Sequence, residues 1–434
     1  MPTSTSPANA ALAPVPAEQR VFGWNTHAAL WFSLGVGLLV MQVGAYLVPA
    51  VGTREAAAAI LAGSALGAAL LGWTARIACT SGLSSAGLMH AAYGSAFARL
   101  PVVLNIVQLV GWTTFEIVVM RDGTAAIAQR AFGLGGATVA ATLLWGAVLV
   151  ALLGGSMLGL VRRFVGRFGL PLVVVSLAWL SWQFAQVLAQ QDGGAFWRHG
   201  GDGSMGMLSA IDLVVAMPVS WLPLVADYAR HGRSARGAFG GTWLGYLVAN
   251  VWCYGLGVLV ASVSAPGTEL VAALLLAQGG LVALGLILID ELDNAYGDVY
   301  SGSVSAHSLL PRWSVRRWGL LLAVLCTGLA LALPMHSLEP FLLLSSVFVP
   351  LYGVILGRLG AGAAAAPSAE RRTDWRAAAL WIGGIALYHA LARWAPGWGA
   401  ALPTLAVTFV LARATRRAPS PPPLSAVAAA RAHG

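Results

Sequence analysis

The sequence predicts an all-α protein that crosses a membrane many times. Hydrophobic residues make up 58% of the 434 residues, charged residues make up only 9%, and the mean hydropathy is +0.77. A soluble domain carries about 25% charged residues, and no water-soluble fold of this length could bury so much apolar surface. The apolar residues also fall in runs of about 20, which is the length that spans a bilayer as a helix. Together these observations exclude a soluble globular domain.

Twelve apolar segments have the length of membrane-spanning helices. In chain order they are residues 28–50, 56–78, 101–128, 136–158, 168–190, 209–228, 240–263, 269–297, 318–334, 338–357, 377–395 and 398–414. The eighth segment can be extended to about residue 303. The ends of the chain, residues 1–20 and 415–434, are rich in Ala, Pro and Ser and are expected to be disordered tails in the cytoplasm.

The positions of the arginines predict the orientation of the protein in the membrane. They are the only basic residues that count here, because the chain has no lysine. With the N-terminus in the cytoplasm, 20 of the 25 arginines fall on the cytoplasmic side of the twelve spans. Cytoplasmic loops of membrane proteins carry such an excess of positive charge. We therefore expect a multi-pass protein of the cell's inner (plasma) membrane with both termini in the cytoplasm. The net charge of +9 is then a topology signal and not a nucleic-acid-binding patch.

Two spans that are five apart carry helix breakers at mid-depth. Span 1, "WFSLGVGLLVMQVGAYLVPA", has glycines around Gln42, and span 6, "DLVVAMPVSWLPLVADYARH", has prolines on both sides of Ser220 and Trp221. A proline frees a backbone carbonyl group and favours a kink. Matched breaks in two five-helix halves are typical of secondary transporters with inverted repeats, which bind substrate at the breaks. Glycine and proline are, however, common in membrane helices in general.

Span 3, which contains "LNIVQLVGWTTFEIVVMRDG", carries a polar stripe. Asn105, Gln108, Trp112 and Glu116 recur at spacings of three and four residues, so a helix places them on one face. One interpretation is a structural Glu116 that bonds to a neighbouring helix. The alternative is a cavity wall, in which the indole stacks on a flat ring and the carboxyl or amide groups bind the edge of that ring.

Span 8 ends in "LILIDELDNAYGDVYSGSVS", which is unusually acidic for this chain. Asp290, Asp293 or Asn294, and Asp298 share one helix face, whereas Glu291 points about 100° away from Asp290. A charge at mid-bilayer costs about 2.5–3.5 kcal/mol, so it needs a partner or a wet cavity. The alternative is that the helix ends near Asp290 and the acids are solvated.

Three stretches of the sequence resemble one family of membrane transporters. They are "QLVGWTTFE", "PVSWLPLVADYARHGRSARGAFGGTWLGY" and "DNAYGDVYSGSVS". The second is the most specific, because it places an aromatic residue at the span 6 break and an Asp-aromatic-x-Arg sequence at the end of the helix. Over residues 20–414 the chain is similar to the nucleobase–cation symporter-1 family, the permeases for cytosine, purines, uracil, hydantoin, allantoin and thiamine precursors. The most similar branch is that of the cytosine or hydroxymethylpyrimidine permeases.

The resemblance implies a LeuT-like fold with a transporter domain over residues 21–414. Two inverted five-helix repeats would cover residues 28–190 and 209–357, with broken helices 1 and 6, and two extra helices would cover residues 377–414. The implied function is cation- or proton-coupled import of a nucleobase-like heterocycle through a lipid bilayer.

The resemblance also implies that the substrate ring lies between aromatic residues of spans 3 and 6. On this sequence Trp112 and Trp221 would stack on the ring, while Glu116 and Asn294 would bind its edge. The full set of candidate substrate-binding residues is Trp112, Glu116, Ser220, Trp221, Asn294, Gln42, Gln108 and Asp293. The Asp227, Tyr228 and Arg230 motif is expected to serve structure or gating.

The chain departs from sodium-coupled relatives in span 8. Those relatives carry a Ser/Thr pair where this chain has Leu288 and Ile289, and a hard cation needs oxygen ligands. Proton coupling is therefore expected, since desolvation favours the neutral form of a buried carboxyl group. The candidate coupling residues are Asp290, Glu291 and Asp298, together with Glu116. Two alternatives stay open: an acid binds Na⁺ directly, or Asp293 and Glu116 bind the amino or amidine edge of a pyrimidine.

Two other classes of function were weighed. A LeuT-like symporter for an amino acid or amine would need a free helix N-terminus or a Gly-rich break for the carboxylate, whereas Pro and Trp at the span 6 break favour a flat ring. An intramembrane enzyme would need a nucleophile pair or a metal constellation. The histidines are scattered and Cys79, Cys253 and Cys326 have no metal-like spacing, so neither an enzyme nor a metal or cofactor site is expected.

Overall fold

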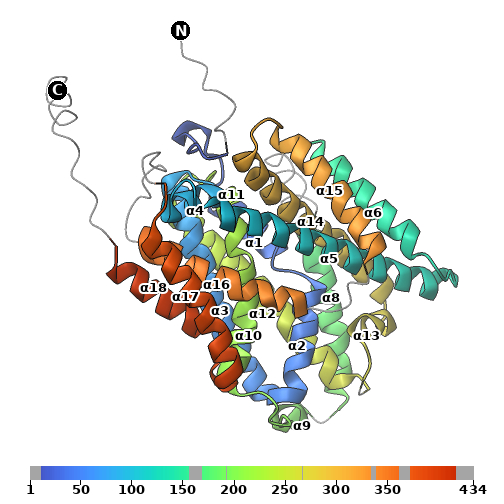
Figure 1. Cartoon of the computed structure of the whole chain (residues 1–434). Helices are drawn as coiled ribbons and strands as arrows, with labels where there is room; N and C mark the ends of the chain where they lie inside the picture. Colours follow the sequence, from blue (N-terminus) through green and yellow to red (C-terminus); the bar gives the residue numbers. More distant parts are fainter. Residues whose placement is uncertain are drawn as a thin grey trace, which may run out of the picture.

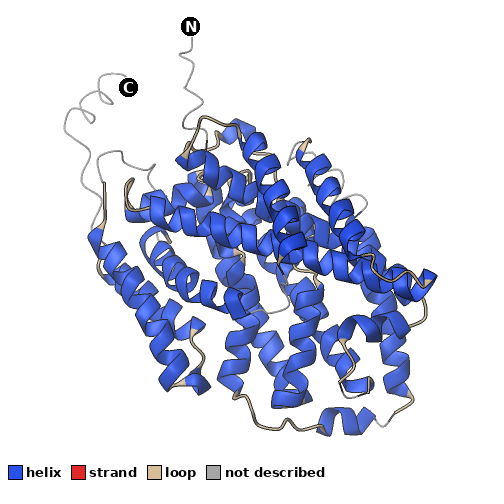
Figure 2. Ribbon diagram, turned by 45° about the vertical axis from the view of Figure 1, so that its right-hand side comes forward, coloured by secondary structure: helices blue, strands red, loops and turns tan. Residues whose placement is uncertain are grey.

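The computed structural model describes residues 11–155, 169–191, 193–265, 267–333, 339–360 and 372–416. Half of the expected N-terminal tail, residues 1–10, and most of the expected C-terminal tail, residues 417–434, therefore lie outside the described residues. Figure 1 and Figure 2 show that the described part is a bundle of helices. Two isolated β-bridges, Phe22–Gly232 and Gly52–Gly200, are the other regular backbone pairings of these ranges.

The helices follow the order expected from the apolar segments. The first half contains α1 (Trp24–Ser33), α2 (Leu38–Val51), α3 (Thr53–Ser81), α4 (Ser85–Tyr93), α5 (Arg99–Phe132), α6 (Thr138–Leu153) and α8 (Leu170–Ala189). The second half follows the short α9 (Gly193–Arg198) and contains α10 (Met207–Ser220), α11 (Leu222–Ala229), α12 (Ala235–Val263), α13 (Leu270–Leu276), α14 (Gly280–Leu309), α15 (Val315–Ala332) and α16 (Glu339–Leu359). The last two helices are α17 (Trp375–Trp394) and α18 (Ala401–Ala414).

Several of these helices can cross a membrane. By length and composition, six spans among the described residues qualify: α3, α5, α8, α10 with α11, α12 and α15. The pair α1 and α2 makes a seventh when it is counted as one span bent by 63°. The helices α6 and α18 and residues 343–359 are apolar but shorter, and α14 is longer but carries four acidic residues. The chain therefore has the make-up of a multi-pass membrane protein, while the count of twelve spans stays a prediction.

Span 8 differs from the expected segment 269–297. The short helix α13 ends at Leu276, and α14 begins only after Gly279, which has a φ of 71°. Glycine adopts this left-handed conformation without a steric cost, so it separates the two helices. Helix α14 then continues past the acidic residues to Leu309. The alternative in which the helix ends near Asp290 is therefore wrong.

Helices of the two halves pack in matching pairs. Helix α3 packs on α12, α5 on α14, and α6 on α15; Figure 1 shows the last pair at the right of the bundle. In the same way, both parts of the broken first span, α1 and α2, contact α12, and both parts of span 6, α10 and α11, contact α3. This matching is what two related five-helix units produce.

Helix α12 touches the backbone of both parts of the bent first span. A methyl group built at Gly245 would lie 2.3 Å from the carbonyl oxygen of Ala28 in α1. One built at Gly257 would lie 1.9 Å from the carbonyl oxygen of Met41 in α2. Any side chain at these two positions would push α1 or α2 away, so glycine is what permits the close packing.

The substitution Gly257→Ala is therefore expected to destabilise the protein by about 1–3 kcal/mol or more, because the new methyl group meets backbone that cannot rotate away. Thermal unfolding in detergent would show this as a lower midpoint. The matched control is Gly255→Ala on the same helix, where an added methyl group has nothing within 4 Å. Equal midpoints for the two variants would contradict the close α2–α12 contact.

The segment before α1 is bound to the bundle. The Arg20 Nη1 atom donates to the carbonyl oxygen of Cys79 at 2.6 Å, and the backbone N–H of Val21 donates to that of His231 at 2.9 Å. Burial, together with the nearby Arg230 and Arg20, lowers the pKa of His231 to about 4. Residues 11–20, which composition assigns to a disordered tail, thus contact the bundle: the Arg20 guanidinium and the backbone N–H of Val15 donate to the backbone carbonyl groups of Cys79 and Gly82.

Candidate functional site

The bend in the first span exposes backbone groups in the middle of the bundle. Helix α1 ends at Ser33, α2 begins at Leu38, and the residues between them are not α-helical. Helix ends leave N–H and C=O groups without partners inside the helix. Helix α14 supplies partners here: the N–H of Leu38 donates to Glu291 Oε1 at 2.6 Å, and Asn294 Nδ2 donates to the carbonyl oxygen of Val36 at 3.3 Å.

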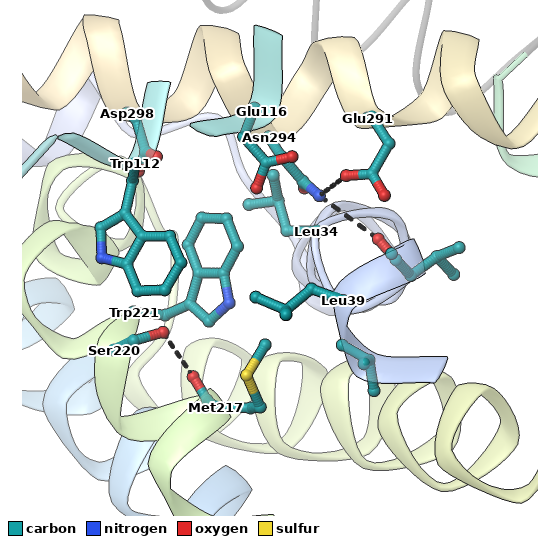
Figure 3. Close-up of a pocket in the computed structure, with 13 residues that line it drawn as sticks. Leu34, Leu39, Trp112, Glu116, Met217, Ser220, Trp221, Glu291, Asn294 and Asp298 are labelled. Carbon is teal, nitrogen blue, oxygen red and sulfur yellow. Dashed lines mark hydrogen bonds between the residues drawn. The ribbon is translucent and has the colours of Figure 1, made fainter. Parts of the chain in front are cut away.

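Asn294 also links the break to Glu291. Its Nδ2 atom donates to Glu291 Oε2 at 3.1 Å, and both dashed bonds of Nδ2 are visible in Figure 3. Since a carboxylate and a carbonyl group both accept, the orientation of the amide is decided by its two partners. The Asn294 Oδ1 atom has no hydrogen-bond partner among the described residues.

A second contact lies at the end of α1. Ser33 Oγ donates to Asp290 Oδ1 at 2.8 Å. Asp293, three residues further along α14, is half-buried, and neither of its carboxyl oxygens has a hydrogen-bond partner in the described part of the chain. The acidic end of span 8 thus faces the broken backbone of span 1 on both sides of the bend.

A cavity opens beside the bend. Its volume is about 30 Å³, below the range of about 300–1,000 Å³ typical of small-molecule sites, so the side chains around it must move apart to admit a ring. The apolar part of the wall consists of Leu34, Val36, Gly37, Leu39, Val40 and Met217. The polar and aromatic lining residues are Trp112, Glu116, Ser220, Trp221, Glu291, Asn294 and Asp298 (Figure 3).

Two indoles line one side of this cavity. Trp221 lies at the junction of α10 and α11, and Figure 3 shows its ring next to that of Trp112 from α5. Trp31 packs edge-on against Trp221 with ring centroids 6.1 Å apart, and Phe115 does the same to Trp112 at 6.1 Å. Edge-to-face packing of this kind holds aromatic rings in place. The indole faces are thus fixed before any ligand binds.

Two of the carboxyl groups line the same cavity. Glu116 on α5 and Glu291 on α14 lie close enough to interact electrostatically. Two ionised carboxylates in one buried site repel each other, so a proton on one of them is favourable. Within the described residues, no salt bridge joins Glu116, Asp290, Glu291, Asp293 or Asp298 to an arginine or histidine. The charge of this group is therefore not neutralised by basic side chains.

The structure brings together most of the residues predicted from the sequence. Trp112, Glu116, Ser220, Trp221 and Asn294 of the substrate set line the cavity, with Glu291 and Asp298 of the coupling set. Asp290 and Asp293 lie beside Ser33 and are not among the lining residues.

Gln42 and Gln108 do not line the cavity. The break lies about one turn before Gln42, so this residue falls within regular α2 and its side chain is exposed. Gln108 is buried but donates through Nε2 to Asn105 Oδ1 at 2.9 Å, and Asn105 Nδ2 donates in turn to Ser305 Oγ at 3.3 Å. Gln108 thus takes part in a hydrogen-bond chain that links α5 to α14 through Asn105.

Ser33 was not predicted as a site residue, although the glycines that follow it in the sequence indicate a break next to it. The break spans "LGVG", so the first two glycines of span 1 mark it and the third glycine, Gly44, lies inside α2. Placing the break at the first pair would have brought Ser33, rather than Gln42, to its edge.

The Asp227 motif lies away from the cavity. Asp227 is fully buried and accepts hydrogen bonds from Ser301 Oγ and from the backbone N–H of Ser85. It therefore joins α11, α14 and the buried α4. The role of this motif in structure or gating stays a prediction.

Comparison with known proteins adds the family. Residues 14–412 match the family model described as "Permease for cytosine/purines, uracil, thiamine, allantoin". The chain belongs to this permease family. Among curated proteins, none matches the sequence of the permease.

Solved structures show the fold of the permease. Mhp1, described as a nucleobase-cation-symport-1 family transporter, in a closed conformation with bromovinylhydantoin bound, matches with a TM-score of 0.77 and 16% identity, over 94% of both chains. The inward-facing conformation of Mhp1 gives 0.74 and 16%, over 94% of this chain and 92% of that one. A Na⁺-coupled sialic acid symporter gives 0.62 and 12%, over 93% and 91%. The permease thus has the LeuT-like fold. Its family makes it a membrane transporter of nucleobase type and not an enzyme.

Proposed function

We propose that this permease imports a nucleobase-like heterocycle, such as cytosine or hydroxymethylpyrimidine, by proton-coupled alternating access. The observation that carries the proposal is the cavity at the bend of span 1, where two fixed indoles face a group of buried carboxyl and amide side chains. The arginine distribution supports insertion in the inner membrane with both termini in the cytoplasm.

The cavity suits a flat ring. Stacking of a base on an aromatic side chain contributes about 1–3 kcal/mol, and Trp112 and Trp221 offer two such faces. Glu116 and Asn294 lie across the cavity from the indoles in Figure 3, where they would bind the polar edge of the ring. These two pairs correspond to the stacking and edge-binding roles expected from the sequence.

The surroundings of span 8 favour a proton over sodium as the coupling ion. Leu288 packs against Gly123 of α5, and Ile289 is 42% exposed. Neither position therefore offers a hydroxyl group to a cation near the bend. Sodium remains the alternative, since the solved relatives are described as a nucleobase-cation symporter and a Na⁺-coupled symporter.

The Glu116–Glu291 pair supports a proton site that is linked to the bend. Glu291 also accepts from the N–H of Leu38, so its charge acts on α2 as well as on Glu116 of α5. Without a proton on either acid, two like charges share one buried site and repel each other. Relief of this repulsion by a proton would favour one arrangement of the helices over another.

The proposal is tested with the purified permease in proteoliposomes. Radiolabelled cytosine and hydroxymethylpyrimidine are offered under an inward proton gradient without sodium, and under an inward sodium gradient without a pH difference. Accumulation is expected only with the proton gradient, compared with protein-free liposomes. Accumulation only with sodium would overturn proton coupling and leave nucleobase transport standing. Absence of uptake for every substrate type in the family description would overturn the substrate class.

A further inference from the structure

A groove on the outside of the bundle separates α3 from α18. Its volume is about 390 Å³, and it shares no lining residue with the cavity at the bend. Helix α18 packs mainly on α16, and Figure 1 shows it at the edge of the bundle. The side chains that mark the groove are Leu66, Trp73 and Arg76 of α3, Phe239 of α12, and Leu402 and Ala406 of α18.

The groove is about as deep as one leaflet of a bilayer. Leu66, Trp73 and Arg76 follow one another at helical spacing, so they lie along one face of α3. The helix rises about 15 Å from Leu66 to Arg76, which is half of the hydrocarbon thickness of about 30 Å. Leu66 is 50% exposed and Ala406 is also exposed, so the groove is open toward the surroundings of the bundle.

Positive charge gathers at one end of this groove. Arg76 is exposed there, and Arg236 lies three residues before Phe239, about one turn nearer the start of α12. Neither guanidinium group has a salt bridge within the described part of the chain. Trp73, one turn from Arg76, packs edge-on against Phe409 of α18 with ring centroids 5.3 Å apart. Membrane proteins place tryptophan and arginine at the level of the lipid headgroups in this way.

We propose that this groove binds an anionic phospholipid of the cytoplasmic leaflet, with one acyl chain between α3 and α18 and the phosphate group at Arg76. A guanidinium group binds phosphate oxygens through two parallel hydrogen bonds. Arg76 is one of the arginines expected on the cytoplasmic side, where the leaflet carries anionic lipids. The lipid thereby joins α18, which follows the two repeats, to α3 of the first repeat. This site is independent of the proposed substrate.

Native mass spectrometry of the purified, delipidated permease measures the headgroup preference. Phosphatidylglycerol and phosphatidylcholine with the same palmitoyl and oleoyl chains are added at equal concentrations, so the two lipids differ in the headgroup alone. The first phosphatidylglycerol is expected to bind at least about fivefold more tightly, which is the effect of one arginine near an anionic headgroup. Arg76→Gln is expected to weaken this binding about fivefold and to leave phosphatidylcholine binding unchanged. The control Arg317→Gln, at an exposed arginine in the first turn of α15, should keep the preference.

A second pair of variants tests the position of the acyl chain. Ala406→Trp fills the groove from α18 and is expected to lower the affinity for both lipids at least about tenfold, because the chain loses its apolar contacts. Val407→Trp is the matched control, since Val407 is 43% exposed on the same helix and does not line the groove. Glycerol phosphate, which carries the charge without a chain, should not displace the bound lipid at equal concentration.

Each contrary result overturns a stated part of the proposal. Equal binding of the two lipids by the unmodified protein overturns the anionic headgroup, and this comparison needs no variant. A preference that survives Arg76→Gln, or lipid binding that is unchanged in Ala406→Trp, overturns the placement in the groove. Displacement by glycerol phosphate overturns the role of the chain. A dimer that dissociates in Ala406→Trp, with no lipid bound to the unmodified protein, assigns the groove to a second copy of the chain instead.

Discussion

Replacement of Trp221 by alanine is expected to abolish uptake of the heterocycle. The indole forms one face of the cavity and sits where α10 meets α11. Loss of a stacked aromatic ring removes about 1–3 kcal/mol, which corresponds to roughly a 5- to 150-fold weaker affinity. Trp112→Ala should act in the same direction. The measurement is the dissociation constant of the purified variants, together with uptake in proteoliposomes.

The matched control for this prediction is Trp182→Ala. Trp182 lies on α8, is 59% exposed and is far in sequence from the lining residues. Its loss should leave binding and uptake unchanged. Because Trp31 packs on Trp221, the unfolding midpoints of the variants must be compared as well. Normal binding by both Trp221→Ala and Trp112→Ala would rule out the aromatic binding site.

Glu116→Gln is expected to separate substrate binding from proton coupling. Glutamine has the size of glutamic acid, and its amide group can donate to Glu291 as a protonated carboxyl group does. It cannot release a proton, however. Exchange of labelled for unlabelled substrate across the liposome membrane should stay within about threefold of the unmodified protein, a difference of less than 1 kcal/mol. Accumulation driven by a proton gradient should be lost.

Two measurements check this expectation: substrate exchange at equal pH on both sides, and accumulation under an imposed pH difference. Glu55→Gln provides the control, since Glu55 is exposed in the first turn of α3. If Glu116→Gln still accumulates substrate in response to the pH difference, Glu116 is not the proton carrier. If it loses exchange as well, its role lies in substrate binding.

Helical spacing explains why part of the site could be predicted from the sequence. Trp112 and Glu116 are four residues apart on one long helix, and Asn294 and Asp298 stand in the same relation on another. Once both segments are helical, geometry alone places each pair on one face. The Trp221 position follows from the prolines that flank it. These predictions needed no knowledge of how the helices pack.

The failed predictions depended on backbone detail that composition does not show. Span 1 contains several glycines, and only packing against α12 and α14 decides which pair forms the bend, so Gln42 was placed one turn too close to it. The residues of α13 are as apolar as those of a spanning helix, so the sequence did not show that the long helix of span 8 begins only after Gly279. The hydrogen bonds of Arg20 and Val21 hold a segment whose composition is that of a disordered tail.

The contacts of α12 have a mechanical consequence for the bend in span 1. A single straight helix touches the backbone on both sides of the bend, at Ala28 through Gly245 and at Met41 through Gly257. Because one helix contacts both sides of the bend, we expect α1, α2 and α12 to move together. Access to the cavity would then open where these helices meet α14, at the hydrogen bonds from Leu38 to Glu291 and from Asn294 to Val36. The bonds that complete the ends of the broken helix would then have to break each time the transporter opens.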